Sequence, residues 1–149
     1  MLIRTVTGND LPAVWKLLVA AGLPVEGVEE NFSDFIVAED GENRIAGVVG
    51  LERYGASALL RSAAVAPSSR GTGLGSRLVK RILERASSHG IRDVYLLTTT
   101  AEEYFPRFGF TRTARADVPE PVKASREFQG ACPDSAVVMK RALAEAGGR

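Results

Sequence analysis

Apolar positions along the chain alternate between the two-residue spacing of strands and the three- to four-residue spacing of helices. Helical spacing runs from Leu11 to Ala21, behind a capping residue at Asn9 or Asp10, and again through residues 75–89. Between these helices the chain is rich in apolar and β-branched runs bounded by turn residues. Strands are therefore expected at residues 2–6, 34–40, 45–55, 57–66, 92–100, 109–115 and 134–143, with a further helical turn within 22–32 and a short helix at 101–108.

This order of elements predicts an α/β fold of the layered α+β kind, in a single domain over residues 1–149. Consecutive early strands are joined by short turns, so the sheet is expected to begin antiparallel. The helix at 75–89 is long enough to carry a parallel crossover to the strand at 92–100. The chain shows no internal repeat and no linker that would divide it.

Composition and charge exclude several classes of protein. The 149 residues are 45% hydrophobic and 25% charged, with a formal net charge of +1, which is typical of a soluble globular protein. A charge so near zero argues against nucleic acid or a membrane surface as a partner, and no apolar run approaches the roughly 18 residues of a membrane span. One cysteine and one histidine leave no internal disulfide and no metal site. The N-terminus has no signal-like pattern, so a cytoplasmic location is expected.

The most distinctive stretch is the glycine-rich run APSSRGTGLGSRL at residues 66–78. It lies between a predicted strand and the start of the long helix, where unpaired N–H groups and the helix dipole favour an anion. Gly71, Gly73 and Gly75 let the backbone approach a ligand closely, and Arg70 adds a charge that pairs with phosphate. The run lacks the Gly-Lys-Ser/Thr of a P-loop and the third glycine of the dinucleotide fingerprint. It is interpreted as a pyrophosphate cradle, with a simple glycine-rich turn as the alternative.

The spacing Val65-x-Pro67-x-x-Arg70-Gly71-x-Gly73-Leu74-Gly75 resembles the acetyl-CoA motif of the GNAT N-acetyltransferases, and the order of elements resembles that family over nearly the whole chain. The resemblance implies the GNAT fold, a mixed central sheet splayed at the cofactor site with helices on both faces, and acetyl-CoA as the co-substrate. It also implies that a backbone N–H near Val65 faces the thioester carbonyl and holds the oxyanion. The cofactor residues implied in this region are Ala63, Ala64, Val65, Arg70, Gly71, Thr72, Gly73, Leu74, Gly75 and Ser76.

A second stretch, LTTTAEEYFPRFGF, departs from the usual pattern of the family. Typical members carry an asparagine and then Phe-Tyr-x-x-x-Gly-Phe; the asparagine helps to hold the cofactor, and the tyrosine protonates the leaving thiolate. Here Thr98 and Phe105 occupy those two positions and are counted among the cofactor residues. The neighbouring Tyr104 would point roughly 100° away on a helix, so it is interpreted as a packing residue. Water or the proton of the amine would then protonate the thiolate.

The same stretch resembles the segment Leu-Thr-Thr-x-Thr-x-x-Trp-Phe of N-acetylglutamate synthase-type amino-acid acetyltransferases, with Tyr104 in place of the tryptophan. Together with LLRSAAVAP and the late run REFQGACPDSAVVMKRAL, it resembles more closely the GNATs associated with arsenic resistance. Both resemblances imply an α-amino acid acceptor with an acidic side chain, such as glutamate, arsinothricin or phosphinothricin. The expected partner is that small molecule, with neither nucleic acid nor membrane, and a homodimer stays open.

Arg61 stands in an otherwise apolar strand, where a buried guanidinium needs an anion. That anion is either a protein carboxylate or the carboxylate of the substrate, and the sequence leaves both open. Ser62 and Thr99 would present hydroxyls to the acceptor, although threonine is also common in strands. Glu52, at the end of its strand, is the candidate general base, with a solvated charge as the alternative. Cys132 is interpreted as a packing residue.

Two other classes of function remain open. Absence of the usual acid would suit a non-catalytic binding module that responds to acyl-CoA. A peptide or protein N-acetyltransferase would need an open groove with acidic residues along it, and a buried arginine in the acceptor pocket argues against that class. Turnover of acetyl-CoA with a free amino acid separates these alternatives.

Overall fold

Seven strands join into one mixed sheet in the computed structural model, which describes residues 1–143. The strands are β1 Leu2–Thr5, β2 Phe35–Glu39, β3 Ile45–Tyr54, β4 Ser57–Val65, β5 Asp93–Thr98, β6 Thr111–Arg112 and β7 Val137–Ala142. Their order across the sheet is β1-β2-β3-β4-β5-β7-β6. β4 and β5 are parallel neighbours, and the remaining neighbouring pairs are antiparallel. The antiparallel start and the parallel crossover are both as the sequence predicts.

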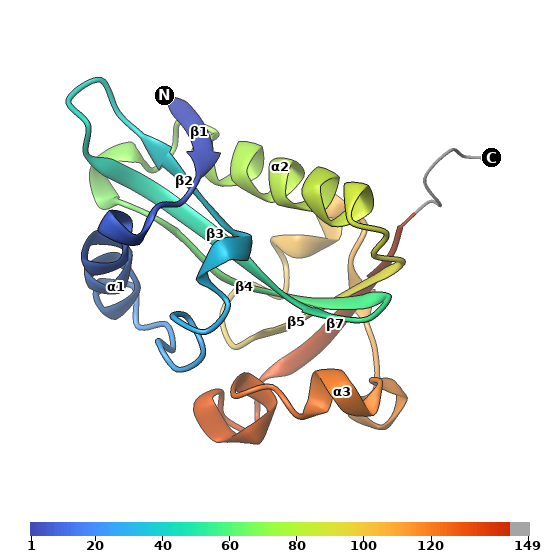
Figure 1. The fold of residues 1–149 in the computed structure, drawn as a ribbon. Coiled ribbons are helices and arrows are strands. Elements are labelled where there is room, and N and C mark those ends of the chain that lie inside the picture. Colours follow the sequence, from blue (N-terminus) through green and yellow to red (C-terminus); the bar gives the residue numbers. More distant parts are fainter. Residues whose placement is uncertain (144–149) are drawn as a thin grey trace.

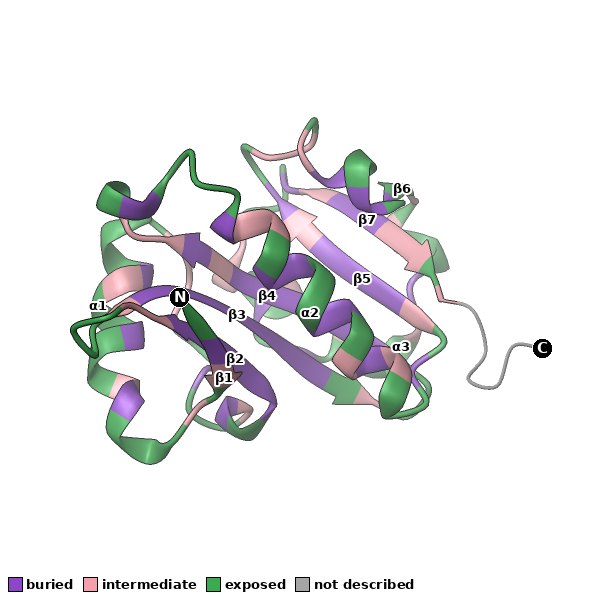
Figure 2. Cartoon of the chain, turned by 90° about the horizontal axis from the view of Figure 1, so that it is seen from above, coloured by how far each residue is buried: buried purple, intermediate pink, exposed green. Residues whose placement is uncertain are grey.

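Helices cover both faces of this sheet (Figure 1). α2, Leu74–Ser88, runs along one face, while α1, Leu11–Ala20, and the short α3, Glu120–Lys123, lie on the other. Figure 2 shows that the central strands β3 and β4 are buried over most of their length where α2 crosses the sheet. The helix contributes an apolar stripe to this core, made of Leu74, Leu78, Val79, Ile82, Leu83 and Ala86. None of the helices formed by residues 1–143 is long and apolar enough to cross a membrane.

The central strands β4 and β5 separate along their length. They are paired only where Ser57–Leu59 runs beside Asp93–Tyr95. β4 then continues to Val65 beside β3, and β5 continues to Thr98 beside β7, without pairing to each other. The sheet is therefore splayed at this end, as the family resemblance implies, and each strand presents backbone groups to the gap.

A β-bulge in β4 lies at the point where the two strands diverge. The register with β3 shifts between the pairs Gly50↔Arg61 and Val48↔Ala64, and Ser62 between them has a φ of +62°. Positive φ is costly for a residue with a side chain and is retained mainly where the surrounding structure requires it. The bulge re-aims the strand, so that the residues after it line the gap.

Most predicted segments form the elements expected of them, including the short strands β1 and β2, but two predictions between residues 101 and 115 do not. The predicted helix at 101–108 is a tight turn, η4, at Phe105–Phe108, and the predicted strand at 109–115 contracts to β6. Residues 116–133, for which the sequence predicts no element, form α3 and a second helical turn, η6, at Glu127–Ala131.

Tertiary packing explains these short turns. Val118 and Val122 are buried against Leu59 and Tyr95 of the central strands. A four-residue helix is unstable alone, so its conformation depends on this contact and leaves no periodic pattern in the sequence.

Candidate active site

The glycine-rich loop leads directly into α2, as predicted. Gly71 and Gly73 have φ of +79° and +82°, and Gly73 is the residue that caps the helix. A Cβ at either position would meet nothing within 4 Å, so glycine is needed here for the backbone conformation. The loop is further held by the Thr72 hydroxyl, which donates to the carbonyl of Ser69 at 2.6 Å. Backbone N–H groups at the helix start are thereby presented to an anion.

Two adjoining hollows lie on the α2 side of the sheet. The loop hollow, about 420 Å³, is lined by Val65, Ser69, Arg70, Gly71, Gly73, Leu74, Gly75, Ser76, Tyr104 and Arg107. The inner hollow, about 150 Å³, is lined by Val48, Ala63, Ala64, Val65, Gly75, Leu78, Val79 and Tyr104. They share Val65, Gly75 and Tyr104, so a polar, arginine-bearing mouth continues into an apolar interior that ends at the splay. This shape suits a long molecule with an anionic head and a narrow arm.

Tyr104, and not Phe105, faces these hollows. Phe105 is buried in the core against Phe108 and Phe110. The ring of Tyr104 packs edge-on against Phe108, and its hydroxyl lies 3.3 Å from the place a Cβ of Gly75 would occupy. Burial raises the pKa of Tyr104, which keeps the phenol protonated. The prediction that Tyr104 packs holds for its ring, but its hydroxyl reaches the hollows.

Thr98 serves the turn that follows β5. Its side chain is buried, and Oγ1 accepts the N–H of Ala101 at 2.9 Å. This bond fixes the start of the turn that carries Tyr104.

Arg107 was missed by the sequence reasoning. Its guanidinium lies 4.5 Å from the centre of the Tyr104 ring, and it lines the loop hollow together with Arg70. The sequence does contain a signal for this role, because Arg107 is a second arginine near a candidate cofactor motif, two residues before Gly109. Arg70 is also exposed, with Nε donating to the carbonyl of Val65 at 3.2 Å. Two arginines therefore face one hollow beside the start of a helix, which favours a ligand with several negative charges.

A third hollow, which we call the opposite hollow, lies on the α1 and α3 side of the sheet. It measures about 260 Å³ and is lined by Gly22, Leu23, Pro24, Leu97, Thr99, Ala131, Cys132, Pro133 and Ala136. Thr99, predicted to face the acceptor, lines it at the end of β5. The other lining segments follow α1 and η6. The unpaired end of β4 lines the inner hollow and the unpaired end of β5 lines this one, so the splay between the two strands lies between the two hollows.

Arg61 is at the centre of a buried charge cluster beneath this face. Its Nη1 donates to Glu52 Oε2 and to the carbonyl of Glu26, both at 2.6 Å. Nη2 donates to the carbonyl of Pro24 at 3.1 Å, and Nε donates to Ser62 Oγ at 3.0 Å. Of the two anions that the sequence leaves open for Arg61, the structure supplies a protein carboxylate.

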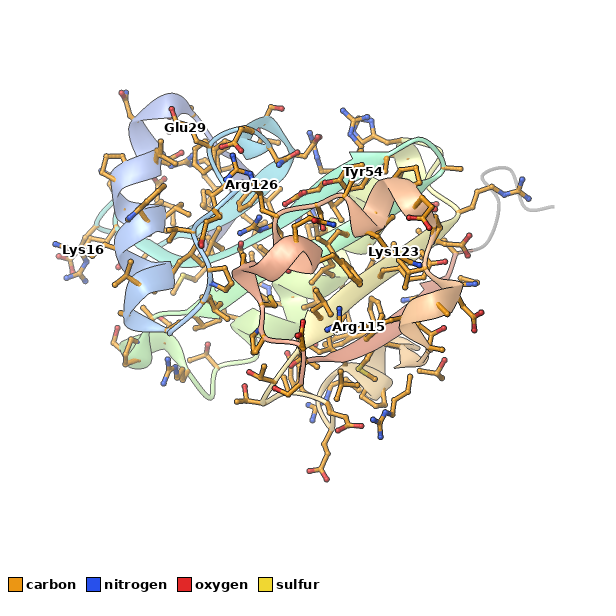
Figure 3. The ribbon with its side chains drawn as sticks, turned by 90° about the horizontal axis from the view of Figure 1, so that it is seen from below. Lys16, Glu29, Tyr54, Arg115, Lys123 and Arg126 are labelled. Carbon is orange, nitrogen blue, oxygen red and sulfur yellow. The ribbon has the colours of Figure 1, made fainter. Side chains whose placement is uncertain are left out.

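Glu52 is buried, so the alternative of a solvated charge at the strand end is wrong. Its side chain is 2% exposed, and its second oxygen accepts a hydrogen bond from the Tyr54 hydroxyl. Burial and the bond to Glu52 raise the pKa of Tyr54. Gly27, with φ of +85°, lies against the ion pair of Arg61 and Glu52, and a Cβ there would come within 2.8 Å of Arg61 Nη1. Figure 3 looks onto this face, where Arg126 lies in view between α1 and Tyr54.

Glu127 is the cluster member that the sequence reasoning missed. It is carried by η6, its side chain is 5% exposed, and its Oε2 lies 3.5 Å from Arg61 Nε. Burial raises the pKa of Glu127 to about 7, although Arg61 opposes the rise. The thiol of Cys132 is next to the Glu127 carboxylate, and burial, with that carboxylate second, raises the pKa of Cys132 to about 12. No periodic pattern marks η6, so the sequence offers no signal that Glu127 is buried.

Comparison with known proteins identifies the family. The pattern of the family described as "Acetyltransferase (GNAT) domain" matches residues 31–112, more than half of the chain. The chain belongs to the GNAT acetyltransferase family. The assignment confirms the fold, the acyltransferase class and acetyl-CoA as the co-substrate expected from the sequence, and the loop and inner hollows fit the anionic head and the arm of that molecule.

Two sequence relatives and two solved structures are similar to this chain. An amino-acid acetyltransferase of Ralstonia nicotianae is 34% identical over 95 residues, which are 62% of this chain and 21% of that protein. The protein YwlB of Bacillus subtilis is 29% identical over 144 residues, 94% of this chain and 96% of its own. This chain therefore spans about a fifth of the amino-acid acetyltransferase and nearly all of YwlB.

The solved structures support the fold. N-acetylglutamate synthase from Neisseria gonorrhoeae, complexed with coenzyme A and N-acetyl-glutamate, superposes with a TM-score of 0.82 at 24% identity, over 95% of this chain and 35% of that one. Rv2747 from Mycobacterium tuberculosis, in complex with CoA, superposes with a TM-score of 0.79 at 23% identity, over 96% and 99% of the two chains. Both likenesses support the overall fold of the chain.

Proposed function

We propose that this GNAT protein transfers the acetyl group of acetyl-CoA to the α-amino group of a small amino acid, with glutamate or a glutamate mimic such as arsinothricin or phosphinothricin as the acceptor. One observation carries the proposal. Hollows on opposite faces of the sheet lie on the two sides of the splay between β4 and β5. A donor held on the α2 side and an amine held on the other side would therefore meet in the gap.

The roles of the residues follow from this arrangement. The start of α2, with Arg70 and Arg107, would bind the pyrophosphate, and Ala63–Val65 would bind the arm along the free side of β4. A backbone N–H near Val65 would hold the oxygen of the thioester carbonyl as charge develops on it. The neutral amine attacks the carbonyl carbon, a C–N bond forms, and the C–S bond breaks. Sulfur then takes up a proton as the nitrogen loses one.

The acidic acceptor is the finer part of the proposal. It is supported by the family resemblance and by relatives that are named for amino-acid acetylation. Arg61 already makes four hydrogen bonds to protein groups. Outside the cluster, Arg115 lies next to the opposite hollow, because its Nη2 donates at 3.4 Å to the carbonyl of Ala136, which lines that hollow. We therefore assign the side-chain carboxylate of the acceptor to Arg115.

Release of free thiol from acetyl-CoA, measured with single amino acids, tests the function. Turnover is expected with glutamate and its mimics, and a lower kcat/KM is expected with glutamine and leucine. Equal kcat/KM for glutamate and leucine would contradict the acidic specificity. Transfer to peptide N-termini but to no free amino acid would show a peptide acetyltransferase, and binding of acetyl-CoA without transfer to any acceptor would show a binding module.

A further inference from the structure

The buried cluster of Arg61, Glu52 and Glu127 holds two carboxylates against one guanidinium. The three side chains are 0%, 2% and 5% exposed, respectively. An excess charge in such surroundings is costly unless a counter-charge or a proton neutralises it. With both carboxylates ionised, this cluster is one positive charge short.

The two carboxylates differ in how completely they are paired. Glu52 accepts from Tyr54 through one oxygen and from Arg61 Nη1 at 2.6 Å through the other. Glu127 Oε2 is 3.5 Å from Arg61 Nε, which donates instead to Ser62 Oγ at 3.0 Å. The capacity to accept a further proton or hydrogen bond therefore lies on Glu127 and not on Glu52.

Both walls of the opposite hollow are anchored on this cluster. One wall contains Pro24, whose carbonyl accepts from Arg61 Nη2. The other contains Cys132, whose backbone N–H donates to the carbonyl of Glu127 at 3.1 Å and whose thiol is next to the Glu127 carboxylate. A cation that enters the hollow is thus separated by one residue, Pro24 or Cys132, from the group that is short of positive charge.

We propose that Glu127 takes the proton from the ammonium group of the acceptor, and that Cys132 is a positioning residue that holds the Glu127 carboxylate toward the opposite hollow. The inference rests on the proposed function, and it specifies the acceptor as a primary amine that is protonated when it binds. The ammonium supplies the missing charge of the cluster, so the amine end of the acceptor is the end that faces Glu127.

The proton and electron pairs balance in this step. An N–H bond of the ammonium breaks, its electron pair stays on nitrogen, and the proton forms an O–H bond with Glu127. The neutral amine then attacks the thioester carbonyl, the C–S bond breaks, and the sulfur leaves with the proton that nitrogen gives up on forming the amide. Glu127 finally releases its proton to solvent, so each turnover yields one amide, one free thiol and one proton.

The groups around Glu127 set its basicity. Arg61 faces it from β4, Glu52 and Tyr54 face it from β3, Glu26 faces it from the loop after α1, and Cys132 lies on its own segment. Burial, Glu52 and Glu26 raise the pKa of Glu127, whereas Arg61 and Cys132 lower it, which leaves it at about 7. A base with a pKa near neutrality is ionised when the substrate arrives and still accepts a proton effectively.

The test is the pH profile of kcat/KM for glutamate, at saturating acetyl-CoA, in the wild type and four variants. The wild type is expected to lose activity below an apparent pKa of about 7. Glu127→Gln should lower kcat/KM by about 10²–10⁴-fold and abolish this acidic limb, with acetyl-CoA affinity unchanged. Cys132→Ala should move the limb to higher pH, since Glu127 loses a neighbouring thiol that lowers its pKa, and Cys132→Ser should restore it. Glu30→Gln, at an exposed glutamate paired with Arg126, is the matched control.

Thermal melting shows whether each variant is folded, and Glu127→Gln should melt no lower than the wild type because it removes the excess charge. Should that variant fail to fold, the shift with Cys132→Ala and its reversal with Cys132→Ser decide the question. An acidic limb that is unchanged in Glu127→Gln overturns this inference and leaves the proposed function intact. If Glu127→Gln is unfolded, an unchanged acidic limb in Cys132→Ala has the same consequence. A wild type that acetylates no amino acid at any pH overturns both.

Discussion

Arg61 links the bulged strand β4 to three other parts of the molecule. Its guanidinium binds Glu52 of β3, the carbonyls of Pro24 and Glu26 after α1, and lies near Glu127 of η6. The sequence predicts that this arginine is buried and needs an anion, because it stands between apolar residues. It could not indicate which anion, because the partners come from distant segments that meet only in the fold.

Replacement of Arg61 by methionine should therefore reduce stability. The change keeps much of the apolar volume but leaves Glu52 and Glu127 without their cation, and breaking a buried pair in this way costs about 3–5 kcal/mol. Chemical denaturation measures the free energy of unfolding, with Arg70→Met, at an exposed arginine, as the control. An unchanged free energy of unfolding, combined with a raised KM for the acceptor, would instead make Arg61 a substrate ligand.

Phe105 and Tyr104 show a second limit of predicting single residues from the sequence. The motif assigns the functional position to Phe105 by counting back from Gly109, and the expected helix would turn Tyr104 elsewhere. The segment is a tight turn that begins at Phe105, with Tyr104 as the residue before it, so counting back from Gly109 along a regular helix does not fix which side chain faces the hollows. Phe105 enters the core and Tyr104 reaches the hollows.

At the scale of elements, α2 and the central strands could be predicted, because each carries a long apolar pattern that matches its burial. The loop before α2 could also be interpreted from the sequence as an anion-binding loop, because glycines and an arginine between a strand and the start of a helix are typical of that role. α3 and η6 could not, because four or five residues carry no period and their conformation depends on packing. Half of the proposed acceptor site, including Glu127 and Cys132, comes from this unpredicted stretch.

The first turn of α2 provides a test of the donor site. A Cβ at Gly75 would lie 3.3 Å from the Tyr104 hydroxyl and 3.6 Å from Val65 Cγ2, where the loop and inner hollows join. Gly75→Val should weaken acetyl-CoA binding by at least tenfold, while the helix keeps its stability because Gly75 has no positive φ. Calorimetric titration measures the affinity, with Arg77→Val, an exposed position on the same helix, as the control. Wild-type affinity in a folded Gly75→Val protein would show that acetyl-CoA binds elsewhere.

At the scale of the whole molecule, the buried cluster makes stability depend on pH. The pKa of Glu127 rises from an ordinary 4.5 to about 7 on folding, chiefly through burial. The folded state therefore binds this proton more tightly than the unfolded state, and the resulting stability is complete below pH 4.5 and is lost as pH rises through 7. A difference of this size corresponds to about 3 kcal/mol.

Melting temperatures between pH 4.5 and 8 should therefore fall more steeply in the wild type than in Glu127→Gln. The difference between the two proteins isolates this group, because the other titrating residues are common to both. Parallel curves would show that Glu127 titrates alike in the folded and unfolded chains and would contradict the buried position assigned to it.

In the proposed reaction, donor and acceptor approach from opposite faces of the sheet and meet at the splay. A bisubstrate compound, in which the sulfur of coenzyme A is joined through an acetyl linker to the nitrogen of glutamate, would occupy both sides at once. Its dissociation constant, measured by calorimetric titration, is expected to be at least about 100-fold lower than that of coenzyme A, because the tether presents the second part at a high effective concentration. A dissociation constant equal to that of coenzyme A would contradict the account.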